Sequence, residues 1–171
     1  MVSRVFGAHS VAPMLVSWEI GSSVARQFEI EAKRDGAKLI EAEHMLLALA
    51  SNADSDAGRL LGEIGLDHQR LAAALREERR RTLAFAGMSA PDTSLVEATG
   101  FDGAPSLGTS AKMAVRRALI GSRHHRRRRG RLRGTDLLAG ILEAEFGTVP
   151  RTLAIAGVDR AALVPRAWGS E

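Results

Sequence analysis

The most constraining feature of this sequence is an internal repeat at a fixed shift of 92 residues. A glycine, an apolar residue and an aspartate follow one another at 65–67 and again at 157–159. Glycine commonly ends a helix and aspartate commonly begins one, so the triplet predicts that both halves of the chain turn at the same point. The other matched pairs are apolar: Ile40 and Leu132, Met45 and Leu137, Leu46 and Leu138, Leu49 and Ile141, Leu61 and Leu153, Leu66 and Val158, Leu71 and Leu163. The sequence therefore predicts two copies of one structural unit.

Apolar spacing predicts that each copy consists of four short helices. Ile20, Val24, Phe28 and Ala32 lie four apart and indicate a helix over 17–34, with Gly36 as its stop. Further helices are expected over 42–50, over 54–64 with an acidic cap, from 67 to about 81, from 109 past 118, and over 135–144, 148–156 and 159–167. The expected organisation is a tail (1–16), a first repeat (17–83), a linker (84–108) and a second repeat (109–168).

The fold class that follows is all-α, with about eight helices in two tandem four-helix repeats. Apolar residues make up 45% of the chain but aromatic residues only 4%, and such a core favours helices over sheets. Four short amphipathic helices bury little surface alone, so the repeats should pack about a pseudo-twofold axis. The seam between them is then the natural place for a ligand groove.

Composition also limits the chemistry of the chain. It contains no cysteine, which excludes disulfides, thiol catalysis and thiolate metal sites and fits a cytoplasmic protein. No run approaches 18 apolar residues, so no membrane span is predicted. The phosphate-loop pattern G-x-x-x-x-G-K-[ST] does not occur, which excludes ATP hydrolysis by that route. We find no catalytic or metal-ligating constellation and expect no enzyme activity, metal or cofactor.

The basic charge of the chain is concentrated in one segment. Residues 123–133 hold seven arginines and no acid, and without them 17 basic residues face 20 acidic ones. A solvated loop or a patch for an acidic partner protein is the favoured interpretation. The alternative is a nucleic-acid-associated regulator that contacts phosphates, although no aromatic residue in the run could stack on bases. The arginines proposed for this basic loop are Arg123, Arg126, Arg127, Arg128, Arg129 and Arg131.

The first copy resembles a known repeat. Its Glu-Ala pair at 31–32, Gly36, Ile40, the run Glu-His-Met-Leu-Leu-Ala-Leu at 43–49 and Gly65 resemble the Clp amino-terminal repeat. That repeat usually has a Glu-Ala pair, a Gly and then Ile-x-x-Glu-His-Leu-Leu-Leu-x-Leu. The second copy matches more loosely, with Gly-Thr-Asp-Leu-Leu at 134–138 and then Leu153 and Gly157. The resemblance covers residues 17–168 and implies a double Clp amino-terminal domain.

In ClpA, ClpB and ClpC chaperones, this domain precedes ATPase modules and receives substrates and adaptors for unfolding. The resemblance therefore implies a stand-alone binding module that acts as an adaptor, a decoy or a regulator. Its partners would be peptides, protein substrates, adaptors, a full-length Clp ATPase or protease complex, or cyclic-peptide antibiotics. The chain has only three lysines beside its many arginines, which fits a GC-rich, actinobacterial genome.

The resemblance also implies two kinds of site. In ClpC-type domains, the glutamate before the histidine holds the guanidinium of phosphoarginine, and a threonine at the first helix start holds the phosphate. Glu43 matches that glutamate in the first repeat, whereas Thr135 replaces it in the second. The threonine position falls on Trp18 in the first repeat and on Gly108 or Thr109 in the second. The implied inter-repeat groove, near the starts of both first helices, would be lined by Met14, Trp18, Val24, Leu107 and Lys112.

Overall fold

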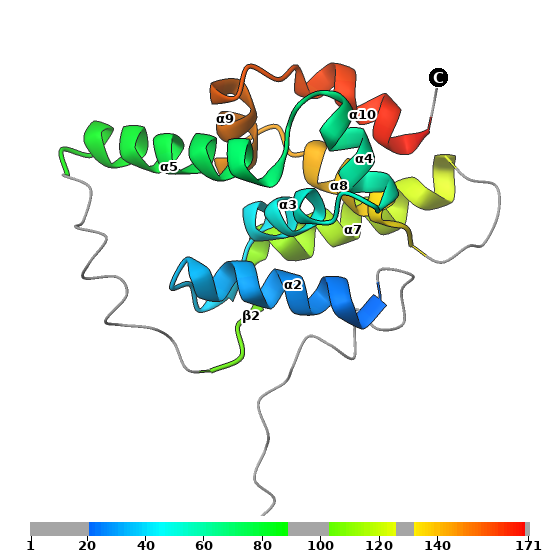
Figure 1. Cartoon of the computed structure of the whole chain (residues 1–171), viewed down its shortest axis with the longest axis horizontal. Coiled ribbons are helices and arrows are strands. Elements are labelled where there is room, and N and C mark those ends of the chain that lie inside the picture. Colours follow the sequence, from blue (N-terminus) through cyan, green and yellow to red (C-terminus); the bar gives the residue numbers. More distant parts are fainter. Residues whose placement is uncertain (1–20, 89–102, 126–131, 170–171) are drawn as a thin grey trace, which may run out of the picture.

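The computed structural model describes residues 21–88, 103–125 and 132–169, and these are almost entirely helical (Figure 1). The first half holds α2 (Gly21–Arg34), α3 (Ala42–Ser51), α4 (Asp56–Glu63) and α5 (His68–Phe85). The second half holds α7 (Thr109–His125), α8 (Gly134–Leu142), α9 (Thr148–Ile155) and α10 (Arg160–Trp168). Two short strands, β1 (Leu39–Ile40) and β2 (Ser106–Leu107), pair in parallel. The predicted all-α fold of about eight helices is confirmed.

The internal repeat extends to individual hydrogen bonds. Helices α8, α9 and α10 each begin 92 residues after α3, α4 and α5. Gly65 and Gly157 both have left-handed backbones, with φ of 66° and 72°, which glycine adopts without strain. The N–H of the residue after each glycine donates to a carbonyl five residues earlier, at 2.9 Å in both repeats. Asp67 and Asp159 then cap α5 and α10, so the repeated triplet forms the same helix-turn-helix junction twice.

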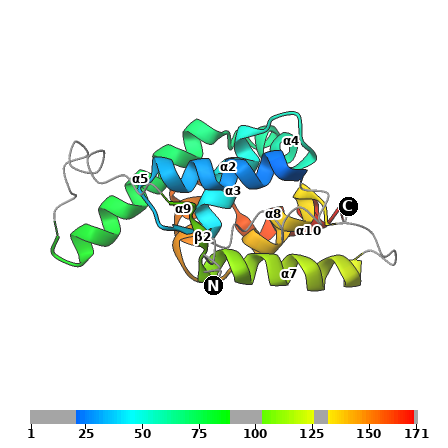
Figure 2. The ribbon, with the colours of Figure 1, turned by 90° about the horizontal axis from the view of Figure 1, so that it is seen from below.

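The two halves pack against each other reciprocally. Within each half the first helix packs on the second, α2 on α3 and α7 on α8. Across the seam the fourth helix of each half contacts the third helix of the other, α5 on α9 and α10 on α4. The two second helices, α3 and α8, contact each other at the centre (Figures 1 and 2). This exchange of contacts is the pattern that two repeats about a pseudo-twofold axis produce.

The core is one cluster centred on α3 and α8. In α3 every residue except Glu43 and Ser51 is buried, and in α8 every residue from Asp136 to Leu142 is buried. A helix that is buried around its whole circumference must be covered by neighbours on every side. Helices from both repeats therefore share one core.

Three local predictions differ from the structure. Helix α4 is capped by Ser55, whose Oγ accepts the N–H of Gly58 at 3.0 Å, and the expected acidic cap at Asp54 is wrong. Helix α5 continues beyond 81 to Phe85, because Glu77 and Glu78 hold the following turn through side-chain bonds to Arg81 and Thr82. Residues 106–107, which the sequence placed in a linker, form β2. The predicted tail and much of the predicted linker lie outside the described residues.

The close crossing of α7 and α8 makes a specific prediction about stability. A methyl group on Gly140 would overlap the backbone of Ala114 and Ala118, whereas one on Gly62 of α4 would meet nothing within 4 Å. Gly140→Ala should therefore lower the free energy of unfolding by about 1–3 kcal/mol through overpacking. Gly62→Ala, the matched control, should leave it unchanged or raise it by about 0.5–1 kcal/mol. Urea denaturation measures both, and equal effects would contradict the tight crossing.

Candidate functional site

A cleft of about 270 Å³ opens at the seam between the repeats, beside the two glycine turns. The first repeat contributes Ile64 and Arg70, and the second contributes the larger part of the wall. The residues from the second repeat are Gly157, Val158, Asp159, Ala162, Leu163 and Arg166. The volume lies just below the range for small-molecule pockets, about 300–1,000 Å³, so the cleft suits a side chain of a peptide better than a whole cofactor.

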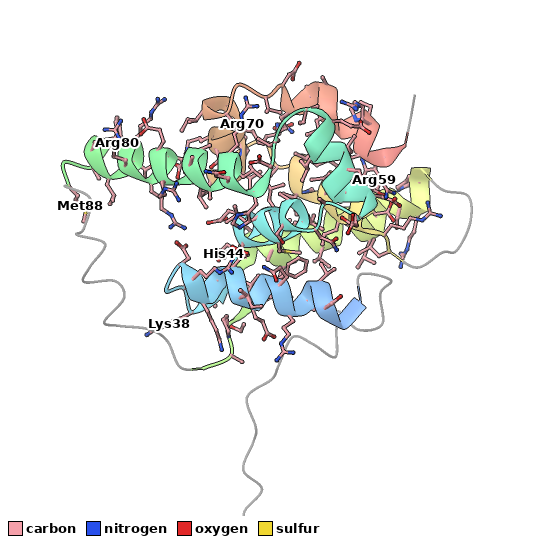
Figure 3. The ribbon with its side chains drawn as sticks, in the orientation of Figure 1. Lys38, His44, Arg59, Arg70, Arg80 and Met88 are labelled. Atoms are coloured by element: carbon pink, nitrogen blue, oxygen red, sulfur yellow. The ribbon has the colours of Figure 1, made fainter. Side chains whose placement is uncertain are left out.

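Hydrogen bonds across the seam hold the rim of this cleft. The guanidinium of Arg70 donates to the carbonyl oxygen of Gly65 at 3.1 Å and to that of Ala156, in the other repeat, at 2.7 Å. Figure 3 shows Arg70 near the start of α5, where this helix approaches α9. Arg166 of α10 donates to the carboxylate of Glu63 in α4 at 2.6 Å. The shape of the cleft therefore depends on both repeats being docked.

The charged residues near the start of α3 form a network that holds the helices together. His44 is 2% exposed, its Nδ1 accepts the backbone N–H of Glu41 at 2.9 Å, and its Nε2 lies 3.1 Å from Asp35 (Figure 3). The Asp35 carboxylate also accepts hydrogen bonds from both terminal nitrogens of the Arg79 guanidinium. Burial raises the pKa of the Asp35 carboxyl, but its hydrogen bonds from His44 and Arg79 outweigh burial and keep that pKa below its usual value of 3.8. His44 is thus a structural residue that joins α2, α3 and α5.

The second repeat keeps the same cap with different chemistry. Asp136 takes the place of His44, and its carboxylate accepts the backbone N–H of Arg133 at 2.8 Å. An imidazole nitrogen and a carboxylate oxygen can both accept this bond, so the duplicated helix start tolerates either residue. Sequence comparison alone would score this pair as a mismatch.

Glu43 and Thr135 occupy the same position in the two repeats, the second residue of α3 and of α8, and both are half-buried. The hydrogen bond to Asp35 raises the pKa of the Arg79 guanidinium, burial opposes this rise, and the negative charges of Asp35 and then of Glu43 add to it. The positive charge of Arg79 would therefore repel the guanidinium of a ligand that bound at Glu43.

The start of α7 is engaged by the chain itself, a contact that sequence reasoning missed. The carboxylate of Glu41 accepts the backbone N–H of Ser110 at 2.9 Å and also its hydroxyl. The Ser110 hydroxyl in turn accepts the N–H of Ala42 at 2.8 Å, so α3 and α7 are joined at their first turns. A side chain on Gly108 would overlap this carboxylate. The helix start where the resemblance places a phosphate therefore already holds an anion.

The other residues of the implied groove are placed differently from one another. Leu107 is 5% exposed in β2, where it pairs with Ile40, and Val24 is partly buried against the core. Lys112 is exposed on α7, and Met14 and Trp18 lie outside the described residues. Arg123 is exposed near the end of α7, whereas the remaining arginines of the predicted basic loop, at 126–129 and 131, also lie outside them.

Within the ranges that the structure describes, no group of three or more His, Asp or Glu side chains could hold a metal ion. None of the described helices is both long enough and apolar enough to cross a bilayer. Comparison with protein-family models and with curated proteins found no match to this chain.

The lowered pKa of Asp35 predicts that the free energy of unfolding decreases at acidic pH. Because the folded-state pKa of Asp35 lies below 3.8, the stability it contributes is present above that pH and is lost as the pH falls below it. Asp35→Asn should lower the free energy of unfolding at pH 7 by about 1–3 kcal/mol, and the difference from wild type should shrink below pH 4. Asp56→Asn, which alters an exposed ion pair with Arg59, is the control and should have little effect. A difference that stays constant from pH 7 to pH 2.5 would contradict the role of Asp35.

Proposed function

We propose that this chain is a non-enzymatic binding module of the Clp chaperone–protease system, which captures a segment of a protein substrate or adaptor. The observation that carries the proposal is the seam cleft, because both copies of a duplicated four-helix unit build it. A cleft whose walls belong to two docked repeats is present only in the folded, assembled domain. A receptor for other proteins needs such a preformed site.

The chemistry of the cleft favours binding over catalysis. Its acidic residue, Asp159, accepts the N–H groups of Ala161 and Ala162 and so caps α10. Its two arginines are engaged with a carboxylate and with backbone carbonyls. A general acid or base must be able to exchange a proton with a substrate, and these groups are committed to holding the helices. The apolar contribution of Ile64, Val158 and Leu163 suits a side chain of a bound peptide.

The family resemblance supports the same proposal. The segment that resembles the Clp repeat most closely, residues 43–49, lies in α3, and the looser copy at 134–138 lies in α8. These two central helices make the core that both repeats share. By analogy with the family, we propose a cytoplasmic protein whose partner is an unfolded substrate, an adaptor, a Clp ATPase or a cyclic peptide.

Filling the cleft tests this proposal. Ala162 lines the cleft, whereas its neighbour Ala161 is exposed on the same helix and does not line it. Fluorescein-labelled casein, a permanently unfolded protein, serves as the probe in an anisotropy titration. Ala162→Trp should weaken binding by at least about tenfold, which corresponds to about 1.4 kcal/mol. Ala161→Trp should change it by less than about twofold.

Circular dichroism must show that both variants keep the helical content of the wild type. The proposal fails if the wild-type protein does not bind casein at millimolar concentration. It also fails if the two tryptophan variants bind equally, because the cleft would then play no part in capture.

A further inference from the structure

The outward face of α7 carries a continuous line of basic and apolar side chains, which we call the α7 stripe: Met113, Arg116, Ile120 and Arg123. Their spacings of three and four residues place them on one face of the helix. All four are exposed, and Met113 and Ile120 are 41% and 46% exposed although they are large and apolar. Over these ten steps the stripe is about 15 Å long, close to three helical turns.

The charge of the stripe is not balanced by the fold. Helix α7 contains no aspartate or glutamate, and the sequence has none from Gly103 to Thr135. Neither Arg116 nor Arg123 forms an ion pair with any residue that the structure describes. Several arginines elsewhere do form such pairs, for example Arg59 with Asp56.

The duplicated helix α2 carries a shorter form of this arrangement: Arg26, Ile30 and Lys33 are exposed at the same spacing, but Ser23 rather than a methionine lies three residues before Arg26. Both first helices bury small or apolar residues on their inner faces, including Ala25 and Phe28 in α2 and Ala114 and Val115 in α7. Helix α2, however, also carries Glu29 and Glu31. Its Arg34 pairs with Glu31 at 3.0 Å, so part of its positive charge is neutralised within the helix. The outward face of α2 therefore resembles that of α7, but it has one large apolar side chain fewer and the half-buried Glu29 beside its cations.

We propose that the α7 stripe docks an acidic, amphipathic helical segment of another protein. Carboxylates spaced three or four residues apart would face Arg116 and Arg123, and apolar side chains between them would cover Met113 and Ile120. Methionine suits such a contact because its flexible thioether adapts to differently shaped partners. A phosphate backbone would satisfy the arginines but would leave the two apolar side chains facing charged groups.

This surface is distinct from the seam cleft. The cleft is lined by residues of α10 and of the two glycine turns, from 64 to 70 and from 157 to 166. Helix α7 runs along another edge of the molecule, as Figure 2 shows. The inference therefore does not depend on the proposed function, and Ala162→Trp should leave binding at the α7 stripe unchanged.

A pair of charge reversals on the two duplicated helices tests the proposal. The probe is a fluorescein-labelled 18-residue peptide with leucine at helical spacing and glutamate elsewhere, and a scrambled peptide of the same composition is its control. Arg116→Glu with Arg123→Glu should weaken binding at least about tenfold, because like charges would then face each other. Arg26→Glu with Lys33→Glu reverses two exposed cations at the same spacing on α2 and should change binding by less than about twofold.

Substitutions of the two apolar residues of the α7 stripe test whether its partner is a protein or another polyanion. Met113→Ala with Ile120→Ala should weaken peptide binding about fivefold at both 50 and 300 mM salt, because contact with apolar surface is not screened. Short duplex DNA and phosphatidylglycerol vesicles are titrated in parallel. The proposal is overturned if the scrambled peptide binds as well, if the α2 variant weakens binding equally, or if the apolar variant binds the peptide like wild type. It is also overturned if DNA or vesicles bind more tightly than the peptide at 300 mM salt.

Discussion

Two helices that are apolar on nearly every side, α3 and α8, can be covered only by helices from both repeats, and the rest of the structure depends on that constraint. Each central helix is covered partly by helices of its own repeat, such as α2 and α5 on α3, and partly by helices of the other repeat. The partner repeat meets this need because α3 contacts α7, α8 and α9, and α8 contacts α4. Because the seam buries the centre of the core, the repeats should fold and unfold together as one unit.

Charged residues buried in this core also help to hold the helices of the two repeats together. Glu78 is 3% exposed in α5, and its carboxylate accepts bonds from Arg151 of α9 at 2.7 Å and from Thr82 at 2.8 Å. Glu31 is buried as deeply in α2, and His68 of α5 lies 3.1 Å from it. A buried carboxylate costs free energy unless it is paired, so these acids select the one arrangement in which their partners reach them. Docking is therefore specified by polar bonds as well as by apolar area.

Much of the fold could be predicted from the sequence because its signals are local. The repeated triplet at 65–67 and 157–159 marks a helix end and a helix start within three residues, and both turns form there. The contact of Glu41 with Ser110 joins residues 69 apart, and no local pattern marks it. The sequence predicts a groove at the seam but not the residues that line this cleft, since its walls come from turns distant in the sequence. In the sequence, Leu107 lies in the predicted linker. Its burial could not be predicted because it depends on the pairing of β2 with β1 at Ile40.

Duplication explains why the outer faces can carry functions that the inner faces cannot. At the inner faces a substitution affects the packing of both repeats. The cap at His44 and Asp136 is an example, because the residue differs but the hydrogen bond to the helix start is kept. On the outer faces a substitution costs little stability, because an exposed charge has few contacts to lose. Helix α7 accordingly carries cations and no acid of its own, whereas α2 carries residues of both signs. Packing does not explain why Met113 and Ile120 are exposed beside two arginines that pair with no described acid, and this surface is best explained by what it binds.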